Sequence, residues 1–232
     1  MENGLSLRPG FKSGSGQSIN DYATATAGQW AAVLRGMSRA INDVRTKTAA
    51  PLRSVADTVY VDFGLVPFLE SQGVTIDKVA YHYYSLATTP YKIYPPSGVP
   101  VDLFAELGKL GKPIIINELN AGEIYAPAQG KPYNDAQALL SLKTHIGYIL
   151  GQTEANIEGA EFYELYDEPS KDAVESNFGL MTDPTHPKTQ MLLAAVYACG
   201  QLTASEQAAL VASNLFTASE LSARRASCPA SH

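Results

Sequence analysis

Acidic, aromatic and amide side chains gather at the expected carboxyl ends of four short apolar segments. Functional residues in parallel α/β folds collect at that end of the strands. A carboxylate can attack or protonate an anomeric centre, an aromatic ring can stack on a sugar, and amides and imidazoles can hold hydroxyl groups. These residue types together indicate a carbohydrate site, and its candidates are Asp62, His82, Tyr83, Tyr84, Asn117, Glu118, Asn120, Glu164, Tyr166, Asp167 and Glu168.

Alternating strand and helix patterns must position these residues. Residues 113–117 (PIIIN) give the clearest strand, because three consecutive isoleucines are typical of a strand buried on both faces. Helical spacing is clearest from Trp30 to Val44, where apolar residues recur every three or four positions. The predicted strands are 54–63, 78–84, 113–117 and 159–166, and the predicted helices are 18–44, 63–72, 101–110, 134–150 and 186–202, with one more helix between 202 and 232.

Strand-plus-helix units in a row predict an α/β fold with a parallel sheet, since right-handed crossovers join such units. A complete (β/α)8 barrel of the TIM type has about 250 residues and twice as many strands. Four strands cannot close a barrel, and they leave two unpaired edges. The strand count therefore accounts for only part of such a barrel.

Residues 111–122 (GKPIIINELNAG) resemble the seventh strand of the clan A glycoside hydrolases, a superfamily of (β/α)8 barrels. In that family a Glu closing this strand is the catalytic nucleophile, and the matching residue here is Glu118. Residues 77–85 (DKVAYHYYS) resemble the sixth strand, where a His and a Tyr flank the nucleophile. The likeness covers most of residues 18–202, with 18–44 as the fourth helix, 52–69 as the fifth strand, 161–169 as the eighth strand and 178–188 as the loop before the last helix.

The resemblance implies the C-terminal half of a retaining glycosidase that acts on an oligo- or polysaccharide, with Glu118 as nucleophile. It also implies a parallel (β/α) half-barrel, with residues 1–202 as a partial catalytic domain and residues 203–232 as a C-terminal helix and tail. The acid/base Glu belongs at the end of the fourth strand, so either Glu2 fills that place or the residue lies upstream of this sequence. The predicted substrate-binding residues are His82, Tyr84, Asn117 and Tyr163, with Glu164 and Tyr166 as alternatives to Tyr163.

Strand alternation places His82 and Tyr84 on one face and Tyr81 and Tyr83 on the other. We expect His82 and Tyr84 to point into the barrel. The hydroxyl of Tyr84 would then donate to Glu118 and keep that carboxylate ionised and aimed.

Other interpretations remain open beside the glycosidase. A non-catalytic carbohydrate-binding or scaffold half-barrel would cover its edges by forming a homodimer, so that two copies supply eight strands. A glycosidase would need its missing N-terminal half, and without it we expect weak or absent hydrolysis by the isolated chain. A third interpretation is another parallel α/β enzyme with a carboxylate base.

Composition argues against several further classes. Net charge is -6 and the 17 Lys and Arg are scattered, so nucleic-acid binding is not expected. No apolar run approaches the roughly 18 residues of a membrane span, and residues 1–16 lack the apolar core of an export signal. With no Gly-rich phosphate loop and only dispersed histidines, we expect neither a nucleotide cofactor nor a metal. Cys199 and Cys228 are expected as free thiols, with a disulfide as the alternative.

Overall fold

A computed structural model of the 232-residue chain describes residues 8–85, 88–95, 97–126, 130–171 and 175–228. The chain divides into two compact units that alternate along the sequence. The first unit comprises Met1–Tyr83, Tyr91–Asn117 and Gln152–Glu161, and the second comprises Tyr84–Pro90, Glu118–Gly151 and Phe162–His232.

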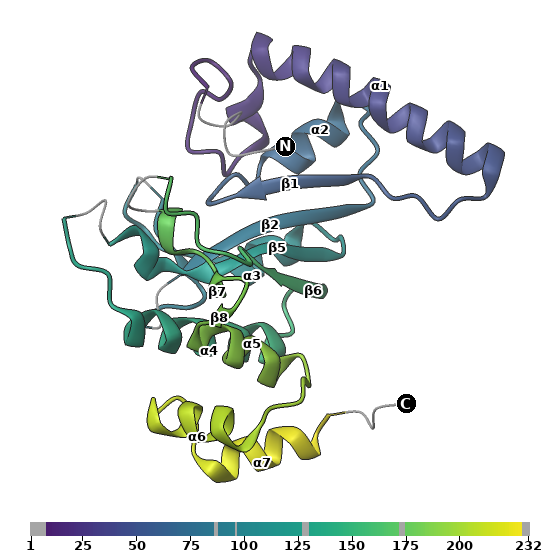
Figure 1. Ribbon diagram of the computed structural model, residues 1–232. Coiled ribbons are helices and arrows are strands. Elements are labelled where there is room, and N and C mark those ends of the chain that lie inside the picture. The colour runs from purple at the N-terminus through teal and green to yellow at the C-terminus, as the bar shows by residue number, and fades with distance from the viewer. Residues whose placement is uncertain (1–7, 86–87, 96, 127–129, 172–174, 229–232) are drawn as a thin grey trace. The chain divides into compact units, whose positions relative to one another are not determined.

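Four parallel strands form the main sheet (Figure 1). β1 pairs with β2 over its whole length, and Val79, Ile114 and Ile116 are fully buried, as expected for strands covered on both faces. The prediction of an α/β fold with a parallel sheet and flanking helices is confirmed, and no closed barrel is found among the described residues. The order across the sheet is β1 (Val55–Val59), β2 (Lys78–Ser85), β5 (Ile114–Ala121) and β6 (Ile157–Phe162).

Three predicted strands differ from the observed ones in length. β1 covers only Val55–Val59 of the strand predicted over 54–63. β5 continues past residue 117 to Ala121, so Glu118 lies inside the strand. β6 ends at Phe162, so Tyr163 and Tyr166 lie beyond it, although the strand was predicted over 159–166. In β5 and β6 the differences lie at the end of the strand, where polar residues follow the apolar ones. Backbone pairing continues through these polar residues in β5 and stops before them in β6, so hydropathy does not predict either end.

The first unit carries α2 (Leu65–Ser71) and α3 (Leu103–Lys109), both inside predicted helices. Asp102 begins α3 by accepting hydrogen bonds from the backbone amides of Phe104 and Ala105 at 3.1 Å. A short antiparallel pair, which the sequence analysis missed, precedes this helix: β3 (Lys92–Ile93) and β4 (Val101–Asp102).

The segment predicted at 18–44 begins as a polar loop, and its helix, α1 (Ala25–Thr48), starts after the predicted cap positions Asn20 and Asp21. Thr24 caps it by accepting a hydrogen bond from the amide of Ala27 at 3.1 Å, and Ile19–Tyr22 form a separate 3-10 turn, η1. Ala27, Ala31 and Ser38 are its buried residues, whereas Met37 of the predicted apolar stripe is largely exposed. Neither α1 nor another helix in the described ranges is long and apolar enough to cross a membrane.

The second unit ends in helices that pack on one another, with α6 and α7 both contacting α5 (Figure 1). One helix was predicted after residue 202, but two form, because the sequence contains two capping boxes, Thr203 with Glu206 and Thr217 with Glu220. The elements of this unit are η2 (Gly122–Tyr125), α4 (Asp135–Gly151), η4 (Glu175–Asn177), β7 (Met181–Asp183), β8 (His186–Pro187), α5 (Thr189–Tyr197), α6 (Ala204–Ala212) and α7 (Ala218–Ala226).

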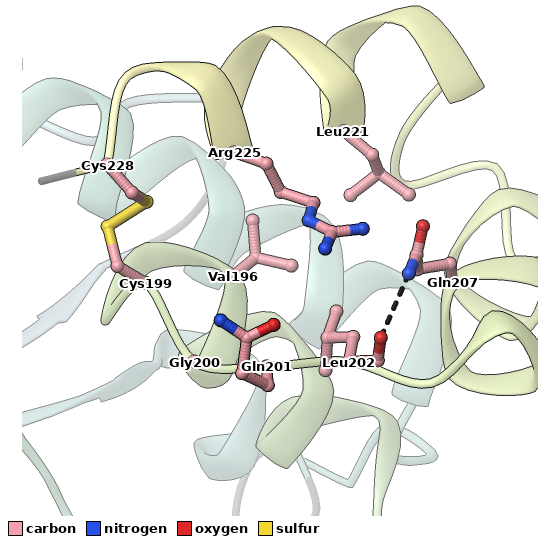
Figure 2. Close-up of a pocket in the computed structure, with 9 residues that line it drawn as sticks. All are labelled: Val196, Cys199, Gly200, Gln201, Leu202, Gln207, Leu221, Arg225 and Cys228. Atoms are coloured by element: carbon pink, nitrogen blue, oxygen red, sulfur yellow. Dashed lines mark hydrogen bonds between the residues drawn. A yellow bond between two sulfur atoms is a disulfide. The ribbon is translucent and has the colours of Figure 1, made fainter. Parts of the chain in front are cut away.

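Cys199 and Cys228 form a disulfide, so the expectation of free thiols is wrong. Cys199 follows α5 and Cys228 follows α7, and their Cα atoms lie 5.6 Å apart (Figure 2). Two intervening helices turn the chain back on itself, and a sequence separation of 29 residues gives no sign of that. The bridge borders a cavity of about 50 Å³ with Leu202, Leu221 and Arg225, a volume suited to water and not to a sugar.

Candidate active site

Glu118 and Tyr84 form a hydrogen-bonded pair in the second unit. Tyr84 Oη donates to Glu118 Oε2 at 2.7 Å, which confirms the contact predicted from the sequence. Glu118 projects from the backbone of β5, and both side chains are half-buried. A carboxylate that is fixed by a strand and a hydrogen bond, yet still accessible, has the geometry a nucleophile needs.

The protonation of Tyr84 suits it to this role. Burial, the hydrogen bond to Glu118 and the charge of that carboxylate raise the pKa of Tyr84 well above its usual value. The phenol therefore stays protonated near neutral pH. It can act as a permanent donor to Glu118, and a negatively charged oxygen is the acceptor that gives the stronger hydrogen bond.

Three further aromatic side chains surround this pair, and we call them the aromatic group: Tyr125, Tyr163 and Phe178. The ring centroid of Tyr84 lies 5.7 Å from that of Tyr125 and 6.0 Å from that of Phe178. Phe178 in turn meets Tyr163 edge to face at 5.7 Å. Aromatic surface next to a carboxylate can take the apolar face of a sugar while the carboxylate reaches its polar atoms.

Tyr163 was predicted for this place, whereas Tyr125 and Phe178 were not. Tyr125 lies in the turn after β5, and Phe178 lies in the loop that follows β6. Neither belongs to a strand end, and the sequence has no signal that would bring these two loops to Tyr84.

Asn120 fixes part of the aromatic group. Its buried side chain donates from Nδ2 to the backbone carbonyl of Tyr163 at 2.5 Å and to that of Phe178 at 3.0 Å. Its Oδ1 accepts from the amide of Ala121 at 2.8 Å. This predicted rim residue therefore ties two loops together.

A group of charges lies beside Tyr163. Lys171 Nζ lies 3.2 Å from Glu168 Oε1 and 3.8 Å from Glu164 Oε2, and it donates to Tyr163 Oη at 3.4 Å. Burial works against the charge of this lysine, but the hydrogen bonds to Glu168 and Tyr163 outweigh it and raise the pKa of Lys171. A hydrogen bond with Glu164 and the hydrogen bond from Lys171 hold the pKa of Glu168 below its usual value. The sequence analysis predicted both acids as rim residues but not the lysine that joins them.

The remaining predicted rim residues of this segment organise its loop. Asp167 Oδ1 accepts from the amide of Gly179 at 2.9 Å and pairs with Lys188 Nζ at 2.9 Å. Tyr166 is exposed and makes an isolated parallel bridge with Met181. These contacts show that Asp167 and Tyr166 hold the loop together.

The first unit contains a polar cluster of Asp57, His82 and Asn117 on β1, β2 and β5. His82 Nε2 donates to Asp57 Oδ2 at 2.9 Å, and Asn117 Nδ2 donates to the same oxygen at 3.4 Å. Two predicted substrate-binding residues therefore meet at one carboxylate. The sequence analysis missed Asp57, although an acid in the middle of a short apolar strand is a signal that could have revealed it.

The opposite face of β2 packs into the core. Tyr81 stacks on Phe63 with ring centroids 6.4 Å apart, and Tyr83 meets Phe104 of α3 edge to face at 5.6 Å. Both tyrosines are fully buried, whereas His82 turns to Asp57. The predicted alternation of faces along this strand is confirmed.

Among the described residues, Asp62 lies apart from these clusters. Asp62 is buried, pairs with Lys12 and accepts from Tyr22 Oη at 2.8 Å, so it anchors the segment before α1. Glu2 lies outside the described residues. Across the described residues, no three His, Cys, Asp or Glu side chains are grouped as a metal site would require.

Comparisons with known proteins do not identify the chain. No protein-family model matches it. No curated protein and no solved structure is significantly similar to it. The functional argument therefore rests on the residues and contacts of the chain itself.

Proposed function

We propose that this chain is the C-terminal half of the catalytic domain of a retaining glycoside hydrolase, with its four parallel strands as strands five to eight of a (β/α)8 barrel. Glu118 is its nucleophile. The observation that carries the proposal is the hydrogen bond from Tyr84 to Glu118, because a protonated phenol holds this carboxylate among aromatic side chains.

In the proposed reaction, a carboxylate oxygen of Glu118 attacks the anomeric carbon of a bound sugar, and the bond from that carbon to the leaving oxygen breaks. The leaving oxygen takes a proton from an acid, and a glycosyl ester forms on Glu118. Water then hydrolyses the ester, so two inversions retain the anomeric configuration. The aromatic group stacks on the sugar, and Tyr84 keeps the nucleophile oriented.

The reaction also needs an acid that protonates the leaving oxygen, and none of the described residues is assigned this role. A retaining enzyme places its two carboxyl groups about 5–5.5 Å apart. Glu2 or a residue of another chain segment would supply the second one. We therefore expect slow turnover of ordinary glycosides, because an unprotonated leaving group departs poorly. Substantial turnover of an aryl glycoside that is lost in Glu118→Gln would contradict this expectation while supporting the nucleophile.

Covalent trapping tests the nucleophile without needing the acid. The chain is incubated with activated fluoroglycosides of glucose, mannose, galactose and xylose, whose leaving groups depart without a proton. Digestion and mass spectrometry then locate any attached sugar. We expect one adduct, on the peptide that contains Glu118, from at least one of the sugars.

Two variants serve as controls for the trapping. Glu118→Gln should form no adduct, because an amide cannot displace the leaving group. Glu161→Gln changes an exposed strand carboxylate instead and should leave trapping unaltered. An adduct on a different residue, or labelling that survives in Glu118→Gln, contradicts the proposal. Sugar binding without any adduct favours the non-catalytic carbohydrate-binding alternative.

A further inference from the structure

An apolar groove runs along the outer edge of the sheet in the first unit. α1, β1 and the segment from α2 to residue 76 line it, and its volume is about 460 Å³. Its apolar lining includes Trp30, Leu34, Met37, Ile41, Val55 and Ile76. Part of this surface faces solvent, since Met37 is 58% exposed and Val55 is 50% exposed.

The position of α1 explains why the groove is uncovered. A helix that precedes a strand in a parallel sheet packs over that strand and its neighbour. α1 precedes β1, and among the described residues β1 is the last strand on its side of the sheet. The apolar residues of α1 that line the groove therefore lie beside a sheet edge. Within the described ranges, no strand pairs with the outer backbone groups of β1.

The other edge of the same sheet is β6, whose exposed residues are small or charged and could fit against an apolar groove. Glu158, Gly159, Ala160 and Glu161 are all exposed, and none of them is a large apolar residue. Gly159 and Ala160 are small enough to let a helix approach the strand closely. β6 runs parallel to β1, so a β6 edge from another molecule can extend the sheet beyond β1 without a change in strand direction.

Charge also distinguishes the two edges. Lys47 in the last turn of α1 and Arg53 just before β1 are exposed and basic. Glu154 just before β6 is exposed and acidic, whereas Glu158 within β6 is paired with Lys78 of β2. Lys47, Arg53 and Glu154 lie near the amino-terminal ends of their strands or at the helix end that leads into one, so parallel pairing would bring opposite charges together.

From these observations we propose that the β1 edge and its groove bind the β6 edge of a second copy of this chain. A twofold dimer makes this contact twice and yields eight parallel strands without a free edge. No residue of the proposed nucleophile site takes part in this contact, and its test uses no sugar. In the proposed hydrolase an N-terminal half would cover the same two edges, so the dimer is proposed for this chain on its own.

Light scattering after size exclusion, over a range of protein concentrations, measures the dimer. Met37→Glu places a charge in the groove and should raise the dimer dissociation constant by about 10- to 100-fold. Val33→Glu is the matched control: Val33 lies on the same helix and is 55% exposed, but it does not line the groove. Circular dichroism should show the same helix content for both variants.

Charge reversal tests the pairing of the two edges. Arg53→Glu and Glu154→Arg should each weaken the dimer, and the double variant should restore it. A wild-type chain that is monomeric at every concentration overturns the proposal, and the groove then belongs to a different segment or partner. A dimer that withstands Met37→Glu, or a double variant that stays as weak as the single ones, also overturns it.

Discussion

At the scale of single residues, Asn120 determines where two aromatic side chains lie. Its amide holds the carbonyls of Tyr163 and Phe178 and so adds to the backbone hydrogen bonds that already join their two segments. The sequence could mark Asn120 as a polar residue after a strand, but not which carbonyls it reaches, because those carbonyls come from loops. Tyr84 was easier to predict, since strand alternation alone aims it toward β5.

Asn120→Ala should lower the free energy of unfolding by about 1–3 kcal/mol, because the carbonyl of Tyr163 loses the amide of Asn120 and that of Phe178 keeps the backbone amide of Glu164 as its donor. Urea denaturation followed by circular dichroism measures this loss. Asn177→Ala is the control: Asn177 is exposed and its amide reaches only the hydroxyl of Ser176, so its effect should be within about 0.5 kcal/mol. Equal effects of the two substitutions would show that the loops do not depend on Asn120.

At the scale of elements, Asp77 joins α1, β1 and β2 at their adjoining ends. Its carboxylate accepts from Arg45 Nη2 at 2.5 Å and from the backbone amide of Ser54 at 2.7 Å. The hydrogen bond from Arg45 outweighs the opposing effect of burial and, with those from Ser54, lowers the pKa of Asp77 from 3.8 to about 2.

The depressed pKa of Asp77 predicts a pH dependence of stability. A carboxyl group with a lower pKa in the folded than in the unfolded chain stabilises the fold above the unfolded value. That contribution is present above about pH 4 and is lost as pH falls toward 2. Asp77→Asn should therefore be less stable at pH 7 by about 1–3 kcal/mol, with the gap to wild type closing toward pH 2. Urea midpoints measured across this range would contradict the account if the gap stayed constant.

The disulfide gives a second prediction at this scale. Joining residues 29 apart restricts the unfolded chain, so Cys199→Ser with Cys228→Ser should lower stability by about 2–4 kcal/mol. Hydrogen exchange should quicken mainly in α7, which the bridge holds to the end of α5. Ser205→Ala with Ser219→Ala changes two exposed helix residues and serves as the control. Unchanged exchange in α7 of the double serine variant would mean that packing alone holds the helix.

The order of the elements could be predicted better than their ends. Buried isoleucines and helical spacing revealed the strands and the main helices, because burial imposes hydropathy on them. The extension of β5 through Glu118 depends on backbone pairing, and the division of the last segment into α6 and α7 depends on two capping boxes. Both are local features that a search for apolar runs overlooks.

At the scale of the whole molecule, the parallel α/β class followed from the string of strand-plus-helix units. The division into two compact units, each built from three separate stretches of the chain, could not be predicted from the sequence. It depends on where along β2, β5 and β6 each residue makes its contacts. The residues of the candidate site likewise fall into those that the sequence predicted and those that it did not. Glu118, Tyr84, His82 and Asn117 stood out by type and strand position, whereas Asp57, Tyr125, Phe178 and Lys171 needed the fold.

The rate of covalent trapping tests most directly the central claim that Tyr84 orients Glu118 as a nucleophile. Tyr84→Phe keeps the ring and removes the hydrogen bond, so trapping by the fluoroglycoside should slow by about 10- to 100-fold. Tyr133→Phe is the matched control, because its hydroxyl reaches a different carboxylate, Asp135, at 3.5 Å. We predict that Tyr133→Phe traps at the wild-type rate and that Tyr84→Phe does not. Equal rates for the two variants would contradict the account.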